Sequence, residues 1–240
     1  DASYGRFDLF NRWTHNVHMQ QALGFFQQTI NEPTLPNVVQ NKSNIDIGQK
    51  EYYNKLTLNL DRHWQVKAAY HFVYTPFNNL IYYNNLGMLG LQYNGNYVNW
   101  QVDAVVGQVT DTLQQQYNLS ATYYPLGNLN VYGISTLMLR NRNGASGLNV
   151  KQVIGCKLMK HAWLEANATL GKFSNLSEND ALYLYHAIDA NQIKLGATAY
   201  IVFNKHLLGQ LGYNFEQRAI YYYQQSFNQH SITGGISCKF

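Results

Sequence analysis

The stretch QHSITGGISCKF, residues 229–240, alternates apolar and polar side chains along its length. The alternate residues on one face are apolar or small: Ile232, Gly234, Ile236, Cys238 and Phe240. Successive side chains of a β-strand point to opposite faces of the sheet. The spacing therefore predicts a strand with one apolar and one polar side, which ends on an aromatic residue.

The same alternation recurs upstream as pairs of segments joined by short turns. In residues 64–74, for example, Trp64, Val66 and Ala68 share an apolar face with the aromatic residues that follow at the same spacing. Tight turns are predicted near residues 62, 95, 127, 160 and 205. The segments are about 10–12 residues long, whereas ordinary strands have about 5–6 and tilted membrane-spanning strands need about 9–11.

The composition also departs from that of an ordinary soluble domain. Charged residues make up 12% of the chain and aromatic residues 15%, with 20 Tyr, whereas soluble domains carry about 25% charged residues. A net charge of +4 without a Lys/Arg-rich run argues against a nucleic-acid partner. Two Cys without metal-ligand spacing predict neither a disulfide framework, nor a metal site, nor a cofactor.

A terminal strand that ends on an aromatic residue resembles the closing strand of outer-membrane β-barrel proteins of Gram-negative bacteria. The resemblance is to this class of proteins and not to one family. It implies a location in the bacterial outer membrane, in contact with its lipid. The chain starts at Asp1 without Met, so we expect that a cleaved export signal preceded it.

Together these patterns predict an all-β fold, an up-and-down antiparallel transmembrane β-barrel of about 12 strands. Eleven strands are counted from residue 51 onward, and bacterial barrels close with even numbers, so residues 16–29 are taken as the first strand. Residues 1–15 are expected to form a periplasmic or lumenal segment, and residues 16–240 the barrel. Longer polar connections are expected opposite the short turns, at residues 30–50, 75–84, 174–191 and 217–228.

The polar faces of the predicted strands carry the residues that would line the barrel lumen. These candidates are Lys55, Lys67, His71, Asp103, Arg140, Lys151, Lys157, Glu165, Lys194, Glu216 and Arg218. Basic residues outnumber acidic ones among them, which favours polar or anionic solutes. The alternative interpretation is that these charges pair across strands and seal a small barrel. Both remain open, because barrels of about eight strands are filled by side chains and those of about sixteen enclose a channel, and twelve lies between.

Three functions follow from this fold. The first is a narrow passive channel for small polar or anionic solutes. The second is a structural or partner-binding subunit of a larger outer-membrane complex, with a protein partner on loop 174–191, where ALYLYHAI (residues 181–188) is an apolar stretch.

An enzyme at the barrel rim is the third and least favoured hypothesis, so no catalytic residue is assigned. His230 and Ser231 are adjacent in a strand and therefore face opposite sides, which prevents them from pairing. Four titratable residues of loop 174–191 could supply an acid and a base, although such a loop is more often only solvated: Glu178, Asp180, His186 and Asp189.

Overall fold

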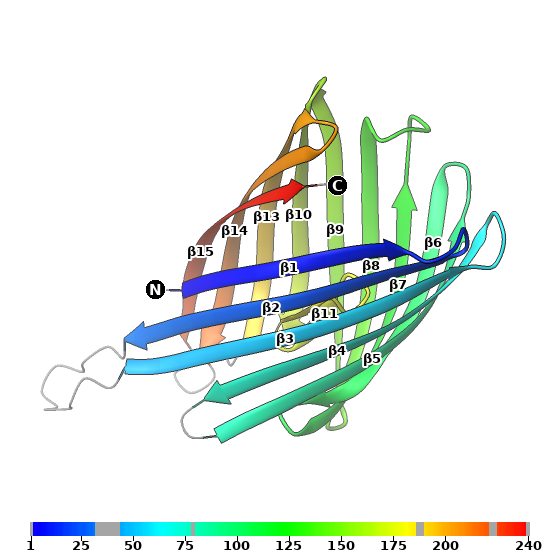
Figure 1. Ribbon diagram of the computed structural model, residues 1–240. Coiled ribbons are helices and arrows are strands. Elements are labelled where there is room, and N and C mark those ends of the chain that lie inside the picture. Colours follow the sequence, from blue (N-terminus) through cyan, green and yellow to red (C-terminus); the bar gives the residue numbers. More distant parts are fainter. Residues whose placement is uncertain (1, 32–43, 78–79, 186–189, 221–224, 239–240) are drawn as a thin grey trace, which may run out of the picture.

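The computed structural model describes residues 2–31, 44–77, 80–185, 190–220 and 225–238. Thirteen strands form one antiparallel sheet in which each strand pairs with its neighbour along the chain, apart from a short hairpin between the tenth and eleventh (Figure 1). The sheet strands are β1 (Ala2–Arg12), β2 (Val17–Asn31), β3 (Asn44–Asn59), β4 (Trp64–Phe77), β5 (Leu80–Asn94), β6 (Val98–Val109), β7 (Thr112–Tyr123), β8 (Val131–Arg142), β9 (Ala145–Met159), β10 (Ala162–Phe173), β13 (Ala190–Asn204), β14 (Leu207–Ile220) and β15 (Gln225–Cys238). The all-β, up-and-down prediction is confirmed.

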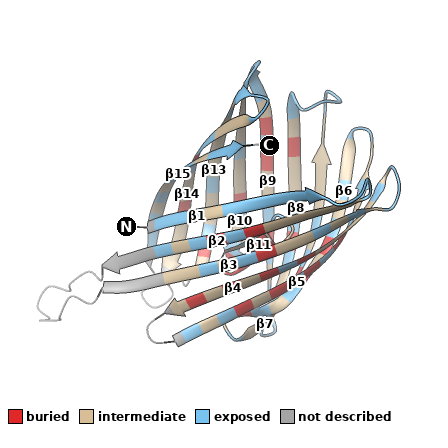
Figure 2. Cartoon of the chain, in the orientation of Figure 1, coloured by how far each residue is buried: buried red, intermediate tan, exposed pale blue. Residues whose placement is uncertain are grey.

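The sheet curls so that one face is concave (Figure 2). Along its strands, burial alternates from residue to residue between this inner face and an outer face. On β6, Val102 is 55% exposed, whereas Asp103 and Val105 are 8% and 2% exposed. On β5, Leu89 is 65% exposed and Met88 is 3% exposed. The two-residue period of the sequence therefore assigns the faces of these strands, with apolar residues on the exposed outer side.

The five predicted tight turns are confirmed, since each lies between two consecutive strands. At the opposite end of the sheet, two further turns are equally short. Thr110 and Asp111 join β6 to β7 with φ of 50° and 55°, and Asn143 and Gly144 join β8 to β9 with φ of 50° and 75°. Positive φ at both central residues is the geometry that matches the twist of a two-residue hairpin. The expected contrast between short turns at one end and long loops at the other is therefore incomplete.

The strand number and the closure of the barrel need correction. Ala2–Arg12 pairs with β2 along its whole length, so residues 1–15 contain the first strand of the sheet instead of a separate segment. The sheet has thirteen strands where about twelve were expected, and within the described residues no pairing joins β1 to β15. The sheet is therefore open, with β1 and β15 as its edges.

Several strands also run further than the sequence predicted. β4 and β5 pair through Pro76, which lies opposite Ile81, so the break expected at residues 75–84 is wrong for the described residues 75–77 and 80–84. β3 begins at Asn44 and β14 continues to Ile220, which shortens two other expected loops in the same way. The last two residues of the chain, including Phe240, lie outside the described part. Among the described residues, no helix is long and apolar enough to cross a membrane.

Candidate functional site

A short hairpin between β10 and β13 occupies the concave side of the sheet. Its strands are β11 (Leu176–Glu178) and β12 (Tyr183–Tyr185), which pair only with each other. Its residues contact side chains from β1, β3, β4, β6, β7 and β9. Contacts with strands so far apart in the sheet place the hairpin inside its curve, where Figure 1 draws it.

Two glutamine side chains of β7 bind the backbone of the first hairpin strand. Gln114 donates to the carbonyl of Asn175 at 2.7 Å. Gln116 donates to the carbonyl of Ser177 at 2.7 Å and accepts from the N–H of Ser177 at 3.0 Å. These bonds satisfy backbone groups that would otherwise be buried without a partner, so the wall fixes the register of β11.

Apolar contacts hold the other side of the hairpin. Ala181 is 2% exposed, and with Leu182 and Leu184 it packs in a cluster with residues of the inner wall. The wall residues of this cluster are Ala22, Tyr53, Ala69, Leu86, Met88, Val105 and Val109. The inner face is therefore partly apolar, which the prediction of a polar lumen did not include.

The turn of the hairpin has an unusual backbone. Asn179, Asp180 and Ala181 have φ of 52°, 58° and 63° in succession. Asn and Asp tolerate this left-handed region, but a side chain such as that of alanine is disfavoured there by about 1–2 kcal/mol. The contacts of the turn with the wall must therefore compensate for this local strain.

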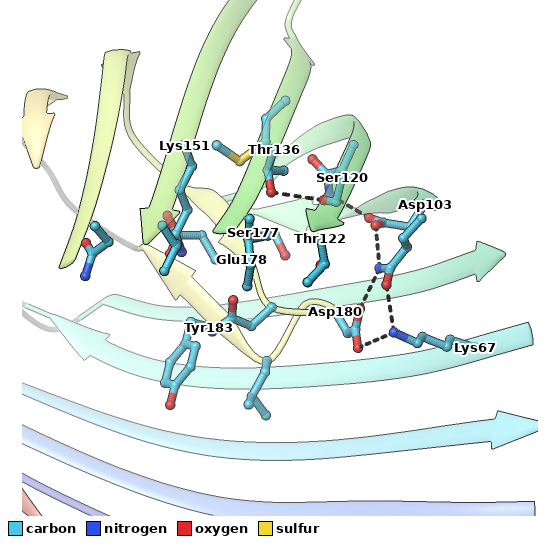
Figure 3. A pocket seen from close by; sticks show the side chains of 18 of the residues that line it. Lys67, Asp103, Ser120, Thr122, Thr136, Lys151, Ser177, Glu178, Asp180 and Tyr183 are labelled. Atoms are coloured by element: carbon cyan, nitrogen blue, oxygen red, sulfur yellow. Dashed lines mark hydrogen bonds and ion pairs between the residues drawn. The ribbon is translucent and has the colours of Figure 1, made fainter. Parts of the chain in front are cut away.

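Asp180 is held by side chains of three wall strands. Figure 3 shows its ion pair with one of them, Lys67. Lys55 of β3 and Lys67 of β4 donate to Oδ2 at 2.9 and 3.3 Å, and Gln101 of β6 donates to Oδ1 at 2.7 Å. Tyr53 donates to the Asp180 carbonyl at 2.8 Å. We call this arrangement of Lys55, Lys67, Gln101 and Asp180 the Asp180 clasp. Burial by itself raises the pKa of Asp180, but Lys67 and then Lys55 outweigh it and hold the pKa below its usual value.

The wall side of the clasp is connected to further wall residues. Gln101 donates to Asp103 at 2.9 Å and accepts from Lys67 at 2.7 Å, and Asn118 donates to the second oxygen of Asp103 at 2.6 Å. The side chain of Lys67 on β4 crosses β5 to reach β6. At the crossing, Gly90 of β5 pairs with Lys67 on one side and with Asp103 of β6 on the other. A Cβ at Gly90 would lie 3.1 Å from the Cβ of Asp103, so glycine leaves room for this crossing.

The second hairpin carboxylate makes a separate ion pair. Glu178 is 8% exposed and accepts from Lys151 of β9 at 2.7 Å. Its burial raises its pKa, but the charges of Lys151 and Lys194 outweigh this effect and lower it. Arg6 of β1 lies over the ring of Tyr183 at 4.9 Å, so the hairpin also meets the first edge strand.

A cavity of about 720 Å³ lies between the hairpin and the wall. The wall contributes four ammonium groups, of Lys55, Lys67, Lys151 and Lys194, and two carboxylates, of Asp103 and Glu165. The surplus of two positive charges is cancelled by Glu178 and Asp180. Among the described residues, no group of three or more His, Cys, Asp and Glu is placed to hold a metal ion.

The structure brings together six of the eleven lumen candidates around this cavity, and they are the six wall residues just named. The other five lie elsewhere. His71 is fully buried against Tyr53, with Nε2 3.6 Å from a Glu51 oxygen. Glu216 and Arg218 pair with each other at 2.7 Å. Lys157 is exposed and lies over the Trp163 ring at 5.0 Å, and Arg140 is half-buried on β8.

The prediction of a solvated loop at residues 174–191 is wrong for the described part of this segment. Glu178 and Asp180 lie in ion pairs with the wall and not at a rim, and Ala181, Leu182 and Leu184 pack inward. His186 and Asp189 lie outside the described residues. His230 is exposed on the outer face, where it bonds to Tyr213 at 2.7 Å, while the neighbouring Ser231 pairs with Asn214 in the register.

Comparisons with known proteins give no further guide to this site. No protein-family model matches the chain, and no curated protein matches it. The interpretation of the hairpin and the cavity therefore rests on their geometry.

Proposed function

We propose that the chain is an integral protein of the bacterial outer membrane that serves as a narrow passive channel for small polar or anionic solutes. The observation that carries the proposal is the contrast between the two faces of the sheet. From β4 to β9, the residues of the outer parity include no Asp, Glu, Lys or Arg, whereas charged residues of both signs gather around the inner cavity.

The outer face suits lipid better than water. Large apolar side chains are exposed on every strand from β3 to β10, among them Leu56, Tyr70, Leu89, Val102, Leu119, Leu139, Ile154 and Leu164. Soluble monomers rarely expose apolar patches beyond a few hundred Å², and this face extends over many adjoining strands. The strands of the sheet have 11–16 residues, enough for tilted strands that cross a bilayer.

Aromatic residues at the short-turn end also support a membrane position. Trp64 and Tyr93 pack against each other with ring centroids 5.0 Å apart, and both are exposed on the outer face. Amphipathic rings are favoured at the depth of lipid headgroups. At the opposite end of the sheet, the aromatic residue Phe173 does not take such a position, because it is fully buried beside Met138 and Leu176.

The open edges set a requirement for this proposal. Unpaired backbone groups are too costly in hydrocarbon, so a sheet that spans a bilayer must close. In an antiparallel sheet of thirteen strands the first and the last run in the same direction. Closure of β1 directly on β15 would therefore form one parallel pair in a sheet whose other pairs are all antiparallel.

A partner-binding subunit is the second candidate, and the free edges of β1 and β15 favour it. An exposed edge can accept a strand from another chain. The apolar stretch in loop 174–191, which suggested a partner on sequence grounds, no longer supports it, because Ala181, Leu182 and Leu184 pack inside the sheet.

Conductance of the purified protein in a planar lipid bilayer tests the proposal. The wild type is expected to conduct weakly, because the hairpin fills part of the lumen. Replacing residues 176–184 with a Gly/Ser linker should enlarge the conductance and add anion preference that fades with salt, since two positive charges lose their counterions. The same replacement in the turn at residues 124–130, outside the cavity lining, serves as the control. A protein that conducts in neither form, while keeping its β-structure in detergent, would favour the partner-binding subunit.

A further inference from the structure

The inner wall presents a set of donors that converge on one carboxylate. Both oxygens of Asp180 are engaged, Oδ2 by Lys55 and Lys67 and Oδ1 by Gln101. We infer that these three wall residues form a binding site for small carboxylate anions, and that Asp180 is a tethered occupant which such anions displace. This inference names a solute class for the proposed channel and so rests on that function, although the site itself can be tested without conduction.

Two of the three donors, Lys67 and Gln101, are bonded to each other within the wall as well as to the hairpin. Gln101 is fixed by its bonds to Asp103 and Lys67, and Asp103 is fixed in turn by Asn118. Lys67, Gln101, Asp103 and Asn118 all belong to the sheet, so removal of Asp180 leaves the donors Lys67 and Gln101 bonded to each other. A site that is organised before its ligand arrives loses less free energy in ordering itself on binding.

The charges of the cavity favour an anion once Asp180 leaves. The wall lining carries two more ammonium groups than carboxylates. Among the residues that line the cavity, the two balancing carboxylates both come from the hairpin. Lys55, Lys67 and Asp180 have side chains that are 12–19% exposed. Ammonium groups so far removed from water are costly without a counterion, which favours their capture of an anion from solution.

The tether explains why a solute can compete. Asp180 reaches the site with φ of 58°, between two more residues in the left-handed region, so part of the binding free energy offsets backbone strain. A free carboxylate carries no such strain. The hairpin nevertheless holds Asp180 at a high local concentration, of the order of millimolar for a short flexible connection, so competition requires millimolar solute or more.

Binding of carbon-13-labelled acetate to the full chain in detergent, followed by NMR, tests the site. Acetate is the probe because it reproduces the Asp180 side chain from Cβ outward. Asp180→Gly vacates the site and suits the positive φ. This variant should bind acetate saturably, at least about tenfold more tightly than the wild type, whose tethered carboxylate competes. Asp111→Gly is the matched control, because Asp111 has φ of 55° in an exposed turn.

Lys67→Met added to Asp180→Gly should abolish the saturable binding, and acetamide, which lacks the charge, should not bind to Asp180→Gly. Asp180→Asn is a second variant, in which a neutral amide of the same volume competes less with acetate than the carboxylate does. Absence of saturable binding in both Asp180 variants, or binding that survives Lys67→Met, overturns the inference. Saturable binding to a protein that never conducts would instead reject the channel and leave the carboxylate site standing.

Discussion

Replacing Asp180 by Asn should raise the population of molecules whose hairpin is undocked from the wall by about two orders of magnitude. The carboxylate pairs with Lys55 at 2.9 Å and Lys67 at 3.3 Å, and the three side chains are at most 19% exposed. Removing one partner of a buried ion pair costs about 3–5 kcal/mol. Asn keeps two polar atoms and tolerates positive φ, so we take about 3 kcal/mol, the low end of that range. At 1.36 kcal/mol for each factor of ten, the open population rises about 100-fold.

Labelling of a buried cysteine in the hairpin measures this opening. Ser177 is 2% exposed, and Ser177→Cys places a thiol beneath the docked hairpin. The native thiols of Cys156 and Cys238 are both free, so Ser replaces them in the test background. When re-docking is faster than the reagent, the labelling rate follows the open population. Asp180→Asn should then label about 100-fold faster, in line with the 3 kcal/mol above.

Asp111→Asn removes a carboxylate from a turn away from the cavity lining and should leave the labelling rate unchanged. A rate in Asp180→Asn that equals this control would refute the reasoning, because the clasp would then contribute nothing to hairpin docking. An equal rise in both variants would point to a general loosening of the sheet.

Three further outcomes are expected. Acid should release the hairpin: the docked pKa of Asp180 lies below its ordinary value of about 3.9, so docking is fully supported above that value and is lost as the pH falls through the docked pKa. Hydrogen exchange of the hairpin amides, corrected for intrinsic rates, checks this, and exchange that does not change on acidification contradicts it. Asn11→Cys should form a disulfide with Cys238 under oxidation in lipid, because direct closure as a parallel pair brings the outer faces of β1 and β15 together at the same end; a lack of cross-linking along β1 would argue against direct closure. Phe173→Ala should lower the free energy of unfolding in denaturant titrations by about 3–5 kcal/mol, whereas Phe203→Ala, at a side chain 61% exposed, should cost far less in detergent.

The alternation of single strands was predictable because a two-residue period is local. β4 shows this best, since its outer and inner residues follow the sequence pattern through to the end of the strand. The first strand was missed because β1 is an edge: most of its residues are exposed on both faces, so burial imposes no clean pattern there. Closure was not predictable from alternation either, since pairing between the ends depends on the whole sheet.

The hairpin was missed because its polar residues resemble a solvated loop. Two signals in the sequence nevertheless pointed inward. The predicted lumen had a surplus of basic residues, which had to find counterions, and Glu178 and Asp180 supply two of them. LGMLGL in β5 is apolar on both parities, which is typical of a strand buried on both sides, and its inward residues Leu86 and Met88 meet the hairpin cluster.

The odd number of strands also fixes where the two ends of the sheet lie. β1 begins at the end of the sheet opposite the short turns, and β15 finishes at the short-turn end. An even-numbered meander returns the chain to the end from which it started, whereas this one does not. In the proposed membrane arrangement, the start of β1 and the finish of β15 therefore face different compartments. Epitopes placed beside them would be reached from opposite sides of the membrane.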